Sequence, residues 1–330
     1  RGEGIDTPVA FHGIWTRDPA MKQVFRVIER AARSEARVLV RGATGTGKEL
    51  VARAIHTLSP RAKGPFRGIN CAALPPALLA SELFGHVRGA FTGAVRDNPG
   101  HFRLADRGTL FLDEVAEMPL DLQAMLLRAL ETGTVIPVGG RDPVAVDVRI
   151  VAATHRGLRA EVAAGRFRAD LMYRLRVVPI FLPSLAERRG DIALLLERFI
   201  DEQNARGGRK IERVAKGARD VLLAYDWPGN VRELHNVVEY AFVVGEGPML
   251  VEADLPPEIA HPDGVYETAI SNAPPPLSET QSETTPEEMR ILRALERASG
   301  SKDRAARLLG MSRTTLWRRL RALGLTSETS

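Results

Sequence analysis

The chain alternates short apolar runs with longer stretches in which apolar residues recur every three or four positions. The short runs predict buried strands, and the longer patterns predict amphipathic helices. A helix is expected from Asp18-Pro19, because Asp is a good N-cap and Pro a good first residue. Further helices are expected at 76–83 and 120–131, and strands at 37–40, 65–70, 109–114, 149–154 and 177–182, with a hairpin-like pair at 134–138 and 144–148. This alternation predicts an α/β fold with a mostly parallel sheet.

Beyond about residue 183 the strand patterns stop, and three helical patterns follow at 191–206, 215–225 and 230–244. They predict a small helical lid, in which Asn230 is expected to cap the third helix. Residues 256–286 are rich in Pro, Ser, Thr and Glu and predict a flexible linker.

Three more helices are expected near the end of the chain, at 287–298, 302–309 and 312–323. The last two are separated by a turn that carries Gly310, and Ser312 would cap the final helix, which predicts a helix-turn-helix. Leu316 would lie on the buried face of the final helix, 312–323. Its first turns would enter the major groove of DNA, with these residues making the contacts: Ser312, Arg313, Thr314, Thr315, Trp317, Arg318 and Arg319. The alternative is a basic helical hairpin with no role in DNA binding.

These patterns divide the chain into five parts: an N-terminal linker (1–12), an α/β subdomain (13–182), a helical lid (183–255), a linker (256–286) and a helix-turn-helix (287–325). The first residue is Arg1 rather than Met. We therefore expect the chain to be a piece of a longer protein with a domain upstream.

Composition and charge narrow the class of protein. The 330 residues are 44% hydrophobic and 26% charged, without an apolar run long enough to span a bilayer, so we expect a cytoplasmic protein with no membrane partner. The single cysteine, Cys71, excludes an internal disulfide. Residues 287–325 contain ten Lys/Arg and four Asp/Glu, a net +6 against +5 for the whole chain. The basic excess therefore belongs to the predicted DNA-binding segment.

A glycine-rich loop follows the strand at 37–40 and precedes an apolar helical pattern. Strand, glycine loop and helix together are typical of a phosphate-binding loop, in which backbone N–H groups and the helix dipole attract phosphate. Lys48 would reach the β- and γ-phosphates. Glu49 stands where Ser or Thr usually binds Mg²⁺. The candidate nucleotide-binding residues here are Gly42, Ala43, Thr44, Gly45, Thr46, Gly47, Lys48 and Glu49. A glycine-rich turn without a ligand is the alternative.

Two further strands end in polar residues suited to ATP hydrolysis. Asp113, at the end of the strand 109–114, would hold Mg²⁺, and Glu114 would polarise the attacking water. A strand that happens to end in an acidic turn is the alternative. The strand 149–154 ends in Thr154-His155, a natural sensor of the γ-phosphate, although His155 alone could equally be structural.

Three arginines are candidates for contacts with a nucleotide. Arg168 and Arg174 lie in a short arginine-rich stretch, which is either a solvated basic helix or reaches the nucleotide of a neighbouring subunit. Arg232 lies in the first turn of the third lid helix and could point back at the nucleotide. Its alternative role is a surface ion pair with Glu233 or Glu239.

The segment 85–94 has three glycines in ten residues and predicts a pliable loop that presents Phe91 and Thr92 at its tip. Alone, it would more simply be a surface loop whose Phe91 packs back into the core.

Together, these residues resemble the bacterial enhancer-binding proteins, the sigma-54-dependent transcriptional activators of the AAA+ ATPase superfamily. The resemblance covers about 13–259 for the P-loop ATPase with its lid, and 287–325 for a Fis-type helix-turn-helix. Glu49 matches this family's form of the glycine loop, and Asp113-Glu114 match its Walker B pair. The family's signature is intact in the residues that would contact sigma-54: Gly89, Ala90, Phe91, Thr92, Gly93 and Ala94.

The resemblance implies further roles. Asn70 would be the switch residue that restrains Glu114, and Thr154 the first sensor. Arg168 and Arg174 would act on the neighbouring subunit's nucleotide, and Arg232 would be the second sensor. Three positions depart from the family pattern: His155 replaces a usual Asn, Ala186 a usual Arg and Arg107 a usual Gly.

The expected function is that of a sigma-54-dependent activator. It would bind ATP and Mg²⁺, assemble as a homo-oligomeric ring, typically a hexamer, and bind upstream double-stranded DNA. Its hydrolysis of ATP would remodel the sigma-54 RNA polymerase holoenzyme from the closed to the open complex, with Phe91 and Thr92 raised in the ATP state. The main alternative is a DNA-binding regulator with a vestigial ATPase that acts through sigma-70 polymerase. A helicase or protein unfoldase is a third possibility, against which the short loop and the helix-turn-helix argue.

Overall fold

A computed structural model describes residues 7–260 and, further along the chain, residues 294, 298, 304–306, 309 and 316. The chain divides into two compact units, Arg1–Gly264 and Val265–Ser330.

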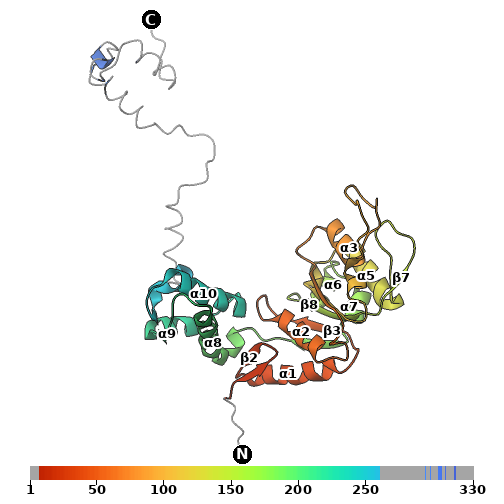
Figure 1. Cartoon of the computed structure of the whole chain (residues 1–330), viewed down its shortest axis with the longest axis horizontal. Helices are drawn as coiled ribbons and strands as arrows, with labels where there is room; N and C mark the ends of the chain where they lie inside the picture. Colours follow the sequence, from red (N-terminus) through yellow and green to blue (C-terminus); the bar gives the residue numbers. More distant parts are fainter. Residues whose placement is uncertain are drawn as a thin grey trace, which may run out of the picture. The chain divides into compact units, whose positions relative to one another are not determined.

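The first unit is built on a five-stranded parallel sheet with the strand order β4-β5-β8-β3-β9. Figure 1 labels two paired strands of this sheet, β8 and β3. Because all strands run the same way, their carboxyl ends meet at one edge of the sheet, where the polar residues that follow them gather. The expected strands are confirmed, and their bounds are Val38–Arg41 (β3), Phe66–Asn70 (β4), Thr109–Asp113 (β5), Arg149–Thr154 (β8) and Val178–Phe181 (β9).

Helices cover both faces of this sheet. On one face α1 and α2 bury Met21, Ile28 and Ile55 against β3 and β8, and on the other face the helices from α3 to α7 form a second apolar core. Asp18 caps α1 as expected, since its Oδ1 accepts a hydrogen bond from the Met21 N–H at 3.1 Å. The bounds are Pro19–Ala32 (α1), Lys48–Thr57 (α2), Pro76–Phe84 (α3), Gly100–Leu104 (α4), Val115–Glu117 (η1), Leu120–Thr132 (α5), Leu158–Ala163 (α6) and Ala169–Leu175 (α7).

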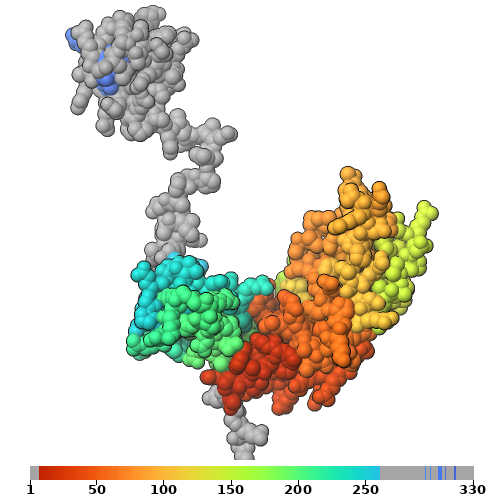
Figure 2. All heavy atoms as spheres, viewed as in Figure 1, coloured from red at the N-terminus to blue at the C-terminus, as the bar shows by residue number. Residues whose placement is uncertain are grey.

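Two segments project side by side from the same end of this subdomain (Figure 2). One is the glycine-rich segment 85–94, and the other is the connection between β6 (Thr134–Val135) and β7 (Val144–Ala145), two strands that are shorter than expected. Backbone hydrogen bonds join them, from Val87 N to Val138 O at 3.1 Å and from Val138 N to Gly85 O at 2.8 Å.

The lid follows the sheet and has its own apolar core around Leu195, Leu222 and the fully buried Trp227. The Thr16 hydroxyl and the Arg17 N–H both donate to the buried Asp191 at 2.6 Å, which ties the start of the chain to the first lid helix. The lid elements are Ala186–Arg188 (η2), Gly190–Arg206 (α8), Arg213–Val214 (β10), Lys216–Ala224 (α9), Asn230–Val244 (α10), Met249–Leu250 (β11), Glu252–Asp254 (η3) and Pro257–Ala260 (α11).

Helices and strands of the described chain lie within two of the expected linkers. Within the expected N-terminal linker, β1 (Val9–Phe11) pairs antiparallel with β2 (Ile14–Thr16). At the expected start of the second linker, α11 buries Ile259 in the lid core. The elements in both segments are only three or four residues long, which is too short for a periodic pattern to reveal them.

In the second unit, the described residues Ala294, Ala298, Ala305, Ala306 and Leu316 form one buried cluster. The expected burial of Leu316 is thereby confirmed. The remaining residues expected to contact DNA (Ser312, Arg313, Thr314, Thr315, Trp317, Arg318 and Arg319) lie outside the described residues, as does most of the linker 256–286. Across the part of the chain that the structure describes, no helix is long and apolar enough to cross a membrane.

Candidate nucleotide-binding site

The glycine loop connects β3 to α2. Gly45 and Gly47 have φ values of +79° and +99°, a left-handed conformation that other residues rarely adopt, and these turns wrap the loop around the start of α2. Gly47 is the N-cap of α2 and makes no side-chain cap, so the first N–H groups of the helix remain available for an anion.

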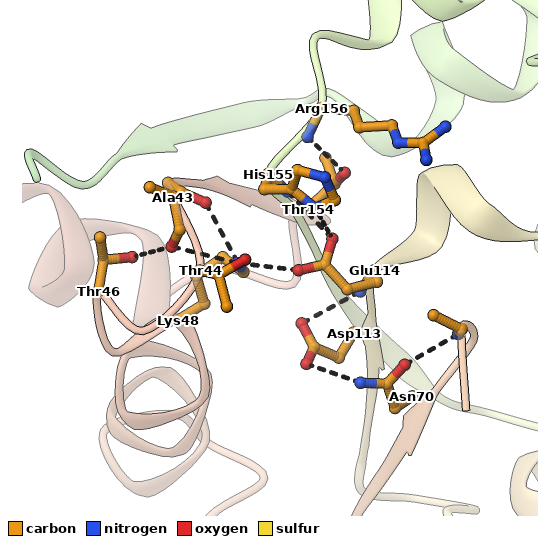
Figure 3. A network of polar contacts seen from close by, with 12 residues as sticks. Ala43, Thr44, Thr46, Lys48, Asn70, Asp113, Glu114, Thr154, His155 and Arg156 are labelled. Atoms are coloured by element: carbon orange, nitrogen blue, oxygen red, sulfur yellow. Dashed lines mark hydrogen bonds and ion pairs between the residues drawn. The ribbon is translucent and has the colours of Figure 1, made fainter. Parts of the chain in front are cut away.

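Lys48 is the first residue of α2, and its buried side chain turns back over the loop. Its Nζ donates to the carbonyl oxygen of Gly42 at 3.1 Å and lies 3.0 Å from Glu114 Oε1 (Figure 3). The amine is thus positioned between the loop and the end of β5, where phosphate groups bound to the loop would meet it.

Asp113 and Glu114 point in different directions from the end of β5. Glu114 has φ +49°, so the chain turns sharply there and sends its carboxylate toward Lys48. Asp113 pairs in register with Asn70 of β4, and Asn70 Nδ2 lies 3.5 Å from Asp113 Oδ2. Burial raises the pKa of Asp113, the charge of Glu114 raises it further, and Lys48 acts in the opposite direction.

The partner of Asn70 therefore differs from the expected one. Asn70 was expected to restrain Glu114, but its amide contacts Asp113, because the sheet register places these two residues side by side and the turn at Glu114 moves that carboxylate away. Asn70 Oδ1 also accepts from the Ala72 N–H at 2.8 Å, which fixes the orientation of the amide.

His155 holds Glu114 instead. Its backbone N–H donates to Glu114 Oε2 at 3.1 Å, and its Nδ1 lies 2.7 Å from the same oxygen (Figure 3). Burial alone would raise the pKa of Glu114, but the hydrogen bonds from His155 and Lys48 outweigh burial and lower it. The carboxylate is therefore kept ionised, as a general base must be.

Thr154 is fully buried as the last residue of β8 and, unlike Glu114 and His155, does not line the cleft beside the glycine loop. Its Oγ1 accepts a hydrogen bond from the Arg156 N–H at 3.0 Å, and its carbonyl oxygen accepts one from the Gly42 N–H at 3.3 Å. Of the expected Thr154-His155 pair, only His155 lines the cleft beside the glycine loop. Thr154 instead contacts the start of the loop, through the hydrogen bond from Gly42 to its carbonyl oxygen.

A cleft of about 530 Å³ unites these groups. It is large enough for a nucleoside polyphosphate, and its lining combines glycine-loop backbone, one lysine and two adjacent carboxylates. The expected residues that line it are Thr44, Gly45, Gly47, Lys48, Glu49, Asn70, Asp113, Glu114 and Arg232, together with His155.

The lining of the cleft suits a Mg²⁺ ion that is coordinated jointly by the protein and by phosphate oxygens, rather than by protein side chains alone. Among the described residues, no group of three or more His, Cys, Asp or Glu side chains could hold a metal. Mg²⁺ characteristically takes one or two carboxylates and completes its shell with phosphate oxygens and water. Asp113, at the end of β5 beside the loop, provides such a carboxylate.

Arg232 reaches the cleft from the lid. Its backbone N–H donates to the Gly45 carbonyl oxygen at 3.3 Å, and its side chain lines the cleft. Within residues 7–260, no ion pair joins it to Glu233 or Glu239. Glu233 accepts instead from the Gly229 N–H, at 2.7 Å.

Arg168, the N-cap residue of α7, and Arg174, in its last turn, lie outside the cleft of their own chain, and both are exposed. Arg168 makes a two-point contact with Asp170, at 3.1 and 2.8 Å. No carboxylate lies within ion-pair distance of Arg174 among the described residues, so its guanidinium is the freer of the two.

In the segment 85–94, the side chain of Phe91 is neither in the core nor fully exposed. Phe91 is 41% exposed, and its ring packs edge-on against His86 with the ring centroids 5.0 Å apart. His86 is held in turn by the Ser81 hydroxyl of α3, 2.7 Å from its Nδ1. Phe91 is therefore neither fully buried nor free, since one face of it rests on the base of its own loop.

Asn230 does not cap α10 as expected. The cap position is Gly229, and Asn230 has φ +55° and directs its side chain inward, where it is 2% exposed. Sequence reasoning thus missed two contributors to this region, His155 as the partner of Glu114 and Asn230 as an internal hydrogen-bonding residue. The Pro-Gly-Asn sequence was the available signal for the second, since Asn tolerates left-handed conformations.

Three family models match the chain in succession: the sigma-54 interaction domain over residues 14–181, the AAA+ ATPase lid domain over 186–269, and the bacterial regulatory protein, Fis family, over 286–323. Similar proteins include the regulatory protein AtoC of Escherichia coli strain K12, which is 45% identical over 98% of this chain and 70% of its own length. The DNA-binding transcriptional regulator NtrC of Klebsiella pneumoniae is 43% identical over 98% of this chain and 72% of its own.

The chain is also similar to solved structures. NtrX from Brucella abortus, crystallised in complex with ATP, matches with a TM-score of 0.68 and 38% identity over 94% of this chain and 68% of NtrX. Its crystal structure in complex with ADP matches with a TM-score of 0.66 and 37% identity over 92% of this chain and 68% of NtrX.

Proposed function

Because the chain belongs to the family of sigma-54-dependent transcriptional activators, with an AAA+ ATPase domain, a lid and a Fis-type helix-turn-helix, we propose that it hydrolyses ATP in a ring of identical subunits and thereby remodels sigma-54 RNA polymerase. The observation that carries the proposal is that Lys48 and Glu114 meet 3.0 Å apart in the cleft beside the glycine loop. A polyphosphate on the loop would then have a cation and a general base on the same side.

Each residue of the cleft has a distinct part in the proposed reaction. The loop N–H groups and Lys48 would bind the phosphates, and Asp113 would hold Mg²⁺, which when bound would supply positive charge beside the phosphates. Glu114 accepts the proton of the attacking water once Lys48 has turned to the phosphates. Asn70 orients Asp113 through the contact at 3.5 Å.

Hydrolysis would need a second subunit. Arg168 at the N-cap of α7 and Arg174 within this helix are exposed outside the cleft of their own chain, where they could reach the cleft of a neighbour. A guanidinium supplied in this way stabilises the charge of the transition state. ATPase activity should therefore rise more steeply than in proportion to protein concentration.

The output would pass through the segment 85–94. Its residues Phe91 and Thr92 would contact sigma-54 when ATP or its transition state occupies the cleft. The basic helix-turn-helix would bind upstream DNA in the cytoplasm and raise the local concentration of the ring at the promoter.

The proposal is tested by Phe91→Ala. We expect this variant to keep its ATPase activity and to lose binding to sigma-54 in the presence of ADP and aluminium fluoride. The matched control is Val243→Ala, which removes an apolar side chain that is 80% exposed on the lid, away from the segment. Unaltered sigma-54 binding by Phe91→Ala would refute the role of the segment. Absence of ATP hydrolysis by the wild type at any protein concentration would instead favour a regulator that acts through sigma-70.

A further inference from the structure

The buried amide of Asn230 contacts three separate parts of the first unit. Its Nδ2 donates to the carbonyl oxygen of Thr44 in the glycine loop at 2.9 Å and to that of Pro228 at 3.2 Å. Its Oδ1 accepts from the backbone N–H of Leu185 at 2.8 Å. Both amide protons are thus used, and with a side chain that is 2% exposed no water can readily replace these partners.

The contact with Thr44 belongs to a tight fit between the glycine loop and the lid. The Arg232 N–H donates to the Gly45 carbonyl oxygen one residue further along the loop, at 3.3 Å. A Cβ on Gly45 would lie 2.0 Å from the Gly229 carbonyl oxygen and 3.1 Å from the Cβ of Arg232. The beginning of α10 therefore rests directly on the loop, with no space for a side chain between them.

The contact with Leu185 lies where the chain crosses from the sheet to the lid. Leu185 is fully buried and immediately precedes η2, the first element after β9 on the lid side. One side chain thus links the glycine loop, the crossover and the first turn of α10. We call this set, Asn230 with Thr44 and Leu185, the Asn230 junction.

The backbone around the junction adopts a conformation that its residues do not favour by themselves. Trp227 and Asn230 have φ values of +53° and +55°, in the left-handed region. Such conformations persist where surrounding contacts hold them. Trp227 is held by burial and by a hydrogen bond from its Nε1 to the Leu222 carbonyl oxygen at 3.0 Å, and Asn230 is held by the junction itself.

We propose that Asn230 is a positioning residue that couples the position of the lid to the conformation of the glycine loop. A nucleotide bound to the loop would thereby determine where Arg232 lies over the cleft. The loop carbonyls of Thr44 and Gly45 face α10, while the loop N–H groups remain for phosphate. When nucleotide binding changes the conformation of the loop, the change is transmitted to α10 through two hydrogen bonds, from Asn230 Nδ2 to the Thr44 carbonyl oxygen and from the Arg232 N–H to the Gly45 carbonyl oxygen. This inference rests on the proposed nucleotide site but does not require hydrolysis or sigma-54.

The first test is Asn230→Asp, which keeps the size and the acceptor for Leu185 but replaces the donor to Thr44 and Pro228 by an oxygen. Hydrogen exchange is measured on the whole chain with and without Mg²⁺ and ADP. In the wild type we expect ADP to slow exchange at residues 230–234 by about tenfold or more, and in the variant by less than about twofold. ADP affinity should fall by roughly tenfold, as for the loss of the one buried hydrogen bond that joins Asn230 to the glycine loop.

Two further variants make the result specific. Asn236→Asp makes the same chemical change at an exposed position of α10 and should respond to ADP as the wild type does. Asn230→Gly accepts the left-handed backbone without strain and removes all three hydrogen bonds. If Asn230→Asp does not fold, Asn230→Gly provides the test of the proposal. Retention of the full ADP-dependent protection in a folded Asn230 variant would overturn the proposal.

A double-mutant cycle with Arg232→Ala separates positioning from general stability. If Asn230 acts through Arg232, the double variant should bind ADP no more weakly than Arg232→Ala alone. Additive losses would show that Asn230 acts independently of Arg232 and would overturn the proposed route. Because only ADP binding and exchange are measured, a wild type that fails to hydrolyse ATP would count against the proposed function and not against the junction.

Discussion

Lys48 Nζ lies 3.0 Å from Glu114 Oε1, so the cation that would bind phosphate and the carboxylate that would activate water neutralise each other. Both side chains are largely buried, so water and salt screen their attraction less than that of an ion pair on the surface. Nucleotide must therefore compete with Glu114 for Lys48, and binding itself would release the general base for its task.

Replacing Glu114 by Gln should separate binding from turnover. The amide cannot accept a proton, so we expect the ATPase rate to fall by at least about 100-fold. It also carries no charge to hold Lys48, so ADP affinity measured by calorimetry should be equal to that of the wild type or higher. The control is Glu131→Gln, an exposed glutamate near the end of α5. Retained hydrolysis in Glu114→Gln would remove Glu114 from the role of base.

Replacing His155 by Ala should change the pH dependence of hydrolysis. The hydrogen bond from His155 helps to lower the pKa of Glu114, and burial, which raises this pKa, would weigh more without it. A base is lost as the pH falls through its pKa, so the acid limb of the kcat profile should move to higher pH. His155→Asn, which retains a side-chain donor, should lie between the two. Superimposable profiles for Ala and wild type would contradict the assignment.

Arg174 should be supplied to a neighbouring subunit. Arg174→Ala and Glu114→Gln are each expected to lack activity, but their mixture should regain part of it. In a mixed ring an Arg174→Ala subunit keeps its own Glu114 and receives Arg174 from a Glu114→Gln neighbour. Arg128→Ala, at an exposed position on α5, serves as the arginine control. A mixture as inactive as its parts would place Arg174 elsewhere in the mechanism.

Cys71 should be inert in the folded protein. Burial raises the pKa of its thiol to about 12, and the charges of Asp113 and Glu114 add to the effect. Since the thiolate is the nucleophile, iodoacetamide at pH 8 should leave the native chain unlabelled. The same reagent in denaturant should label the single cysteine fully. Rapid labelling without denaturant would show that the core around β4 opens readily.

The sheet and the glycine loop could be predicted because their signals are local. Apolar runs define the strands, and a glycine loop between strand and helix has few other uses. The pairing of Asn70 with Asp113 could not be predicted, because it depends on the register between β4 and β5, and no sequence pattern encodes that register.

The roles of Thr154 and His155 depended on where β8 ends. Thr154 is the last residue of a strand that is buried along its whole length, so its side chain stays inside, and His155 is the first residue free to turn into the cleft. Asn230 is a similar case, since a helix-capping residue and a left-handed residue one position later share the same sequence preference.

In the segment 85–94, which carries Phe91, the glycines at the base and at the tip differ in the space around them. A Cβ on Gly85 at the base would lie 2.5 Å from the Asn98 carbonyl oxygen, whereas a Cβ on Gly89 or Gly93 would meet no atom within 4 Å. The φ values of these two tip glycines are +81° and +99°. Handedness, rather than space, therefore excludes side chains at the tip. D-alanine introduced there by chemical ligation would suit both backbones and fix the tip in the described shape, where L-alanine would force it into another.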